Sequence, residues 1–123
     1  MPTNSAGGYL GLFSNESALN ATENQIVAVE FDTYQNGGDP RANHVGIDVN
    51  SIVSDVNVTW NGSFSNTANA WVSYNSATKT LSVFLTFADN QVFNGNSSLS
   101  YIVDLMTVLP EWVSVGFSAA TGV

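Results

Sequence analysis

Six short runs of β-forming residues, separated by clusters of Asn, Ser, Gly and Asp, set the pattern of this sequence. The runs alternate apolar with polar residues or are rich in Val, Ile and aromatic residues, as is typical of strands, and no segment keeps a helical period. They are QIVAVEFD (25–32), HVGIDVN (44–50), NAWVSYN (69–75), TLSVFLTF (80–87), LSYIVDL (99–105) and WVSVGFS (112–118). Many short strands joined by turns predict an all-β fold, an antiparallel sandwich.

The connections between the runs carry their own signals. Asn75 to Lys79 is predicted to be the tip of a hairpin, and Met106 to Pro110 a short helical turn or loop before the last run. The chain has no repeat, linker or low-complexity segment. We therefore expect residues 1–123 to belong to one domain.

Charge excludes some partners. The net charge is −8, and the only basic residues are Arg41 and Lys79, which argues against nucleic acid or anionic membranes. The longest apolar run, near Leu81 to Ala88, is far too short to span a bilayer. The absence of cysteine leaves the redox compartment open.

Acidic side chains gather around the first of the longer runs. Because side chains alternate along a strand, Glu30 and Asp32 share one face, opposite Val27, Val29 and Phe31. The turn formers at 35–40 predict a reversal of the chain before the run that begins at 44. A hairpin or long loop closing in this way would bring the side chains at positions 39 and 44 back over the two carboxylates.

Ligand chemistry then distinguishes candidate metals. Carboxylates with one neutral imidazole, here His44, suit a divalent transition ion such as manganese. Carboxylates with an amide oxygen, a main-chain carbonyl and water suit calcium, and Asp32 and Asp39 could serve both ions. An exposed acidic strand face followed by an ordinary Asn/Gly-rich loop accounts for the spacing equally well. The residues by themselves leave both interpretations open.

Several motifs together resemble the legume-type (L-type) lectins. The run VAVEFDT (27–33), then Asn36, Asp39, His44 and GIDVNSI (46–52), resembles the metal-binding segment of that family in order and spacing. Other matching stretches are GGYLGLF (7–13), NAWVSYNSATKTLSV (69–83) and VLPEWVSVGFSAATG (108–122). The resemblance covers nearly the whole chain. It implies a legume-lectin-like jelly-roll β-sandwich, and specifically the central to C-terminal part of that domain.

The resemblance also implies a manganese site. Glu30 and His44 would be manganese ligands, and Asp32 and Asp39 would bridge manganese and calcium. Ser54 would lie behind the manganese ligands and hold a bound water, and such outer partners orient the ligands.

A calcium site and a neighbouring sugar site are implied as well. The Asn36 side chain and the main-chain carbonyl of Tyr34 would complete the protein's share of the calcium ligands. At the sugar, the Asn36 amide would donate to a hydroxyl and the Tyr34 ring would stack on the pyranose, while the Gly8 N–H would donate a further hydrogen bond. The expected partner is a saccharide or glycoconjugate, and the expected activity is binding without catalysis.

The chain departs from the family at its ends. In relatives an Asp-Gly element, whose Asp binds the sugar, precedes the position of Gly7, and a specificity loop follows that of Gly122. We therefore expect residues 1–123 to form a single partial lectin domain. Missing strands would leave open edges, which favour association into a homo-oligomer.

Two other functions remain in view. A lectin-like extracellular receptor or structural domain that has lost sugar binding is compatible with the missing aspartate. A β-glucanase-like glycosidase would place three acids at alternating positions of one strand, but here the series is Glu30, Asp32, Tyr34 and lacks the third carboxylate.

Five triplets fit the acceptor pattern for N-linked glycans and favour a secreted or extracellular protein. They begin at Asn15, Asn20, Asn57, Asn61 and Asn96. HVGIDVNSIVS (44–54) and other phrases resemble the ectodomains of plant lectin receptor kinases more than seed lectins. The start, MPTNSAGG, has no basic or apolar region of a signal peptide.

Overall fold

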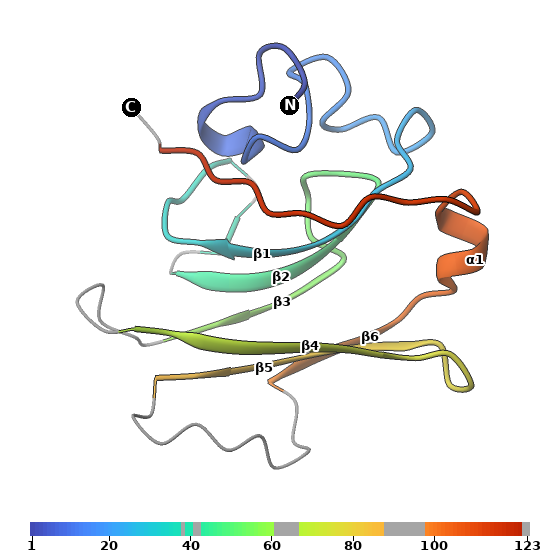
Figure 1. Cartoon of the computed structure of the whole chain (residues 1–123). Coiled ribbons are helices and arrows are strands. Elements are labelled where there is room, and N and C mark those ends of the chain that lie inside the picture. Colours follow the sequence, from blue (N-terminus) through green and yellow to red (C-terminus); the bar gives the residue numbers. More distant parts are fainter. Residues whose placement is uncertain (38, 41–42, 61–66, 88–97, 122–123) are drawn as a thin grey trace.

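The computed structural model describes residues 1–37, 39–40, 43–60, 67–87 and 98–121. These residues form two three-stranded antiparallel sheets with short helical turns, so the predicted β-sandwich is confirmed (Figure 1). In chain order the elements are η1 (Gly7–Tyr9), β1 (Val27–Asp32), β2 (His44–Val49), β3 (Val56–Thr59), β4 (Asn69–Asn75), β5 (Thr80–Thr86), β6 (Leu99–Ile102) and α1 (Leu105–Val108).

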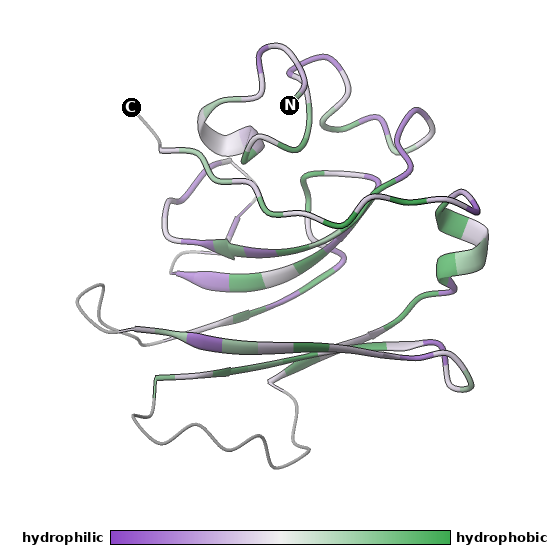
Figure 2. Ribbon diagram, viewed as in Figure 1, coloured by the Kyte–Doolittle hydropathy of each residue, from purple (hydrophilic) through white to green (hydrophobic). Residues whose placement is uncertain are grey.

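The central strands of the two sheets hold the core. The sheets are ordered β1-β2-β3 and β4-β5-β6, and apolar residues alternate with polar ones along their strands (Figure 2). Val45 and Ile47 of β2 are buried in one cluster with Leu81 and Val83 of β5. Each such side chain contributes roughly 2 kcal/mol on burial, and together they hold the two layers in contact.

The sheet formed by β1, β2 and β3 is buried on both faces at β2. Val45 and Ile47 face the other sheet, whereas the alternate residues His44, Gly46 and Asp48 are also buried, on the opposite face. The N-terminal loops lie on that side of the sheet (Figure 1). A main-chain hydrogen bond of 2.9 Å from Ile52 N to Ala18 O ties these loops to the segment after β2. Polar groups on this face of β2 are therefore shielded from water.

Two connections in the chain were predicted correctly from their turn-forming residues. β4 and β5 pair from Asn69↔Thr86 to Asn75↔Thr80, and residues 76–79 form the predicted hairpin tip. The Asp104 carboxylate accepts a hydrogen bond of 3.2 Å from the Met106 N–H and caps α1, the predicted helical turn. β3 was missed by the sequence analysis. None of the described helices is long and apolar enough to cross a membrane.

The prediction of a strand at 112–118 is wrong. This segment is extended but belongs to neither sheet of the described residues. Its apolar side chains are open to solvent: Trp112 is 87% exposed, Val115 93% and Phe117 105%. The hydroxyl of Ser118 donates a hydrogen bond of 2.7 Å to Leu10 O. A strand is defined by a hydrogen-bonded neighbour, and sequence propensity does not supply one.

Candidate metal and sugar site

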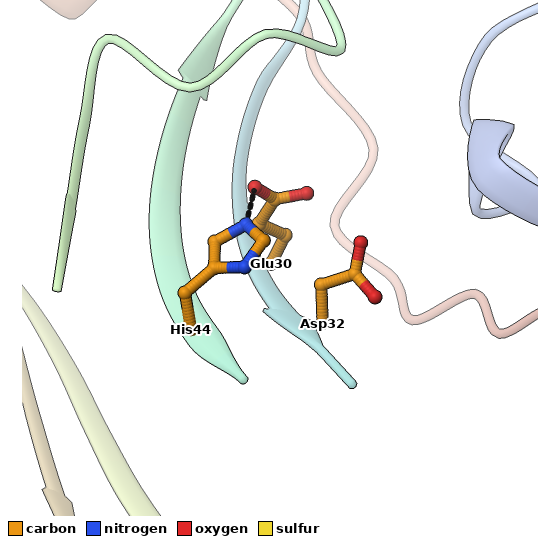
Figure 3. A group of neighbouring side chains, drawn as sticks. All are labelled: Glu30, Asp32 and His44. Atoms are coloured by element: carbon orange, nitrogen blue, oxygen red, sulfur yellow. Dashed lines mark hydrogen bonds and ion pairs between the residues drawn. The ribbon is translucent and has the colours of Figure 1, made fainter. Parts of the chain in front are cut away.

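The hairpin of β1 and β2 brings three of the predicted metal ligands together. The strands pair antiparallel with Asp32 opposite His44 and Glu30 opposite Gly46, so the three functional side chains share one face. Glu30, Asp32 and His44 are 5%, 7% and 2% exposed, and one ligand atom from each lies within 4.8 Å of the others. Figure 3 shows these side chains side by side. Two carboxylates and an imidazole thus converge in a buried cluster.

Hydrogen bonds organise the cluster around one oxygen atom. Glu30 Oε1 lies 3.1 Å from His44 Nε2 and accepts a hydrogen bond from the Ser54 hydroxyl. Burial raises the pKa of Glu30, and the hydrogen bond from Ser54 opposes that rise. The Ser54 hydroxyl therefore lies directly against the Glu30 carboxylate.

The cluster lacks a nearby compensating side-chain cation among the described residues. Lys79 pairs with Asp104 on the other sheet, at 2.5 Å, and Arg41 lies outside the described residues. Two buried carboxylates without a fixed positive charge are costly, because each loses its hydration. A divalent cation would offset this cost. The donor set of carboxylate oxygens and one imidazole nitrogen fits a transition ion such as manganese.

Gly46 is a functional residue that the sequence analysis missed. A Cβ built at this position would lie 2.7 Å from Glu30 Oε1 and would also collide with the Ser54 hydroxyl. Only glycine leaves room there for the carboxylate and the hydroxyl to meet. A glycine inside a run of strand-forming residues was the available signal, since it often marks a close approach of another group.

Asp48 is the second residue that was missed. It is fully buried, and neither carboxylate oxygen has a hydrogen-bond partner among the described residues. Burial, together with the nearby charge of Glu30, raises the pKa of Asp48 to about 8. The group is therefore protonated at neutral pH. Its sequence signal is weak, because an acidic residue in an alternating strand usually points to solvent.

Substituting Asn for Asp48 is expected to stabilise the metal-free protein increasingly as pH rises. The folded-state pKa of about 8 lies above the ordinary value of 3.8, so between these values only the folded state holds the proton. Stability from this group is therefore lost as pH rises from about 4 to 8. We expect the free energy of unfolding of Asp48→Asn to equal that of the parent protein near pH 4 and to exceed it increasingly up to pH 8, because each unit of pKa shift corresponds to about 1.4 kcal/mol. Urea unfolding of both proteins in chelator, across this pH range, measures the difference in their stability. A difference that does not change with pH would contradict the prediction.

Two of the predicted ligands, Asp32 and Asp39, accept hydrogen bonds from backbone N–H groups of the loop after β1, and these bonds orient the two carboxylates. Asp32 Oδ1 accepts from the Tyr34 N–H at 2.7 Å, and Asp39 Oδ2 accepts from the Asn36 N–H at 2.7 Å. Asp39 does not belong to the group formed by Glu30, Asp32 and His44, although it follows closely in the same loop. The oxygen donors of this loop are of the kind that calcium prefers.

The predicted sugar-binding residues lie around the same loop. A Cβ at Gly8 would be 2.8 Å from Asn36 Nδ2 and 2.9 Å from its Oδ1, so the N-terminal turn η1 lies directly against the Asn36 amide. Tyr34 is 60% exposed, which leaves its ring accessible to a ligand. Gly8, Tyr34 and Asn36 thus come from two segments far apart in the sequence.

The domain is thus a β-sandwich that holds a buried cluster of two carboxylates and an imidazole. The family model described as the legume lectin domain matches residues 1–123, and the chain belongs to that family. Agglutinin-2 of Cladrastis kentukea is 53% identical over 123 residues, which are 99% of this chain and 42% of the relative. A mannose/glucose-specific lectin of Centrolobium tomentosum is 52% identical over 126 residues, covering 99% of this chain and 50% of the relative.

Solved structures show the same fold. A lectin from Bauhinia forficata in complex with GalNAc has a TM-score of 0.85 and 47% identity, over 95% of this chain and 52% of that one. The metal-free form of lectin I-B4 from Griffonia simplicifolia has a TM-score of 0.82 and 44% identity, over 95% and 50%. The chain therefore spans about half the length of the proteins it matches. The homologues are non-enzymatic plant lectins, which removes the support for a β-glucanase.

Proposed function

We propose that this chain is part of a metal-dependent carbohydrate-binding domain of a plant lectin, without catalytic activity. The observation that carries the proposal is the buried cluster of Glu30, Asp32 and His44, followed by a loop whose Asn36 amide lies against Gly8. A buried acidic cluster without a cation is costly, and a sugar needs polar groups held in fixed positions. The hairpin of β1 and β2 supplies the cluster, and its loop together with the turn at Gly8 supplies the polar groups.

Manganese and calcium are the proposed ions. Glu30 and His44 would hold manganese, since an imidazole beside carboxylates suits a transition ion. Asp32 and Asp39 would contribute to both sites, and the hydrogen bonds that they accept from the loop backbone orient them. The Ser54 hydroxyl positions the Glu30 carboxylate.

Calcium would take the oxygen donors of the loop. These are the Asn36 side chain and the Tyr34 carbonyl, together with the two shared aspartates. When bound, the ions supply positive charge that fixes the loop before the sugar arrives. A fixed loop lowers the entropic cost of binding, which matters for a shallow site with few contacts.

The sugar itself would be held by complementary polar and apolar contacts. The exposed ring of Tyr34 can stack on the C–H face of a pyranose, and the Asn36 amide can donate to a hydroxyl. The Gly8 N–H would donate a further hydrogen bond to the sugar, and a side chain at Gly8 would displace Asn36. Relatives named for mannose, glucose or GalNAc supply the probes to use first.

Removing the Tyr34 ring is expected to weaken saccharide binding about tenfold. A stacked aromatic ring contributes roughly 1.5 kcal/mol, which corresponds to a factor of ten in affinity. The experiment is a calorimetric titration of mannose, glucose and GalNAc into metal-loaded protein and into the Tyr34→Ala variant. Tyr101→Phe, on β6 of the other sheet, is the control and is expected to bind normally. Equal affinity in Tyr34→Ala and the parent protein would overturn the proposed site.

We further propose an extracellular location, as a secreted lectin or as the ectodomain of a plasma-membrane receptor kinase. The acceptor triplets for N-linked glycans support this location. Glycoconjugates at the cell surface are then the proposed partners. Association into homo-oligomers stays a proposal that sedimentation of the purified protein would test.

A further inference from the structure

The loop before β1 contains an acceptor triplet held in a local turn. The Thr22 hydroxyl donates a hydrogen bond of 2.7 Å to Asn20 Oδ1, and the Glu23 N–H donates one of 3.1 Å to Asn20 O. These bonds join residues at most three positions apart, so the turn can form locally in a growing chain. Among the described residues, no group accepts a hydrogen bond from Asn20 Nδ2. The amide nitrogen is left unengaged while the hydroxyl of the same triplet meets the amide oxygen.

The folded protein also holds this turn at a fixed place on its surface. The Asn24 side-chain amide donates to Asn20 O at 3.1 Å and to Asn50 O at 2.9 Å, which ties the turn to the end of β2. Thr22 is exposed, and the neighbouring Leu19 is 74% exposed. Asn20 itself is partly exposed, and none of these three residues belongs to the buried core.

The other described triplets lack this arrangement. At the first, the Asn15 side-chain oxygen accepts a hydrogen bond of 2.7 Å from the Tyr9 hydroxyl, while the Ser17 hydroxyl pairs with Ser14 at 2.9 Å. The amide and the hydroxyl of that triplet are therefore directed to different partners. Asn57 lies within β3, in the ladder opposite Gly46. The triplets beginning at positions 61 and 96 lie outside the described residues.

We propose that Asn20 is a site of N-linked glycosylation. The donor is an oligosaccharide joined through a diphosphate to a polyprenyl lipid, used by a membrane-bound transferase. Asn20 Nδ2 forms a bond to the anomeric carbon as the bond from that carbon to the diphosphate oxygen breaks. The electron pair leaves with the diphosphate, and one Nδ2 proton passes to a base of the transferase. The assignment rests on passage through the secretory system, as proposed above, and does not depend on sugar binding by this chain.

The test uses the full chain behind a cleavable signal sequence, translated in the presence of microsomes from the endoplasmic reticulum. Entry into the microsomes is then imposed, so the natural location of the protein does not affect the result. Only chains protected from added protease are analysed. Enzymatic removal of the glycan leaves aspartate where a glycosylated asparagine stood, and peptide mass spectrometry reads this change at Asn20 itself.

Three matched variants separate glycosylation from other changes. Thr22→Ala removes the hydroxyl and Ala21→Pro blocks the acceptor pattern, and both are expected to reduce modification of Asn20 to background. Thr22→Ser keeps the hydroxyl and is expected to retain it. Protease-protected chains with unmodified Asn20 would overturn the proposal, as would modification that persists in Thr22→Ala.

Discussion

Chelating divalent metal is expected to lower the melting temperature of this protein by about 10 °C. Ions that bind only the folded state stabilise it by about 3 kcal/mol at a hundredfold excess over their Kd, and in a domain of this size each kcal/mol shifts the midpoint by roughly 4 °C. The reason lies in Glu30, Asp32 and His44, which are buried together without a compensating cation among the described residues. Differential scanning calorimetry with manganese and calcium, and then with excess chelator, measures the shift.

Two variants test whether this change in melting temperature arises from the cluster of Glu30, Asp32 and His44. His44→Ala is expected to lose the part of the shift that manganese supplies, because it removes the only imidazole of the chain, whereas the proposed calcium ligands remain. Asp104→Asn alters a carboxylate outside the cluster, at the start of α1, and is expected to keep the full response. A chelator response as large in His44→Ala as in the parent protein would place manganese elsewhere.

Adding one methyl group at Gly46 is expected to weaken metal binding by roughly 10- to 100-fold, the range seen when partners behind the ligands are disturbed. The new Cβ of Gly46→Ala would lie 2.7 Å from Glu30 Oε1, so the carboxylate or β2 must shift. Overpacking of a buried site also costs about 2 kcal/mol of folding stability. Titration of manganese into the metal-free variant, followed by calorimetry, measures both effects.

Gly37 provides a matched control for this substitution. It lies in the loop after β1, where a Cβ would meet no atom within 4 Å, and it does not adopt a positive φ. Gly37→Ala is therefore expected to change neither stability nor metal affinity appreciably. Equal behaviour of the two variants would show that the space behind Glu30 does not govern the site.

The sequence predicted the features that depend on local spacing. Alternation along β1 placed Glu30 and Asp32 on one face, and the turn formers at 35–40 predicted the reversal that sets His44 opposite Asp32. The contact between Gly8 and Asn36 was implied only by the resemblance, because nothing local links residues in separate segments. Composition and turn signals were sufficient for the class of fold and for the hairpin of β4 and β5.

What the sequence could not predict depends on neighbours far along the chain. Asp48 occupies a polar position in an alternating strand, where an acidic residue is usually exposed. It is buried because loops cover the outer face of β2. The run at 112–118 has the strongest strand composition near the C-terminus, but the described strands do not pair with it. In both cases propensity is local, whereas burial and pairing are tertiary.

The most direct measurement for the central claim is a calorimetric titration of manganese into the metal-stripped protein. The account predicts saturable binding to one site formed by Glu30, Asp32 and His44, with the heat lost in Glu30→Gln and in His44→Ala. Binding should also weaken as pH falls, because the Glu30 carboxylate, whose pKa is raised by burial, must be deprotonated to bind the ion. Absence of saturable heat in the parent protein, or unchanged heat in both variants, would contradict it.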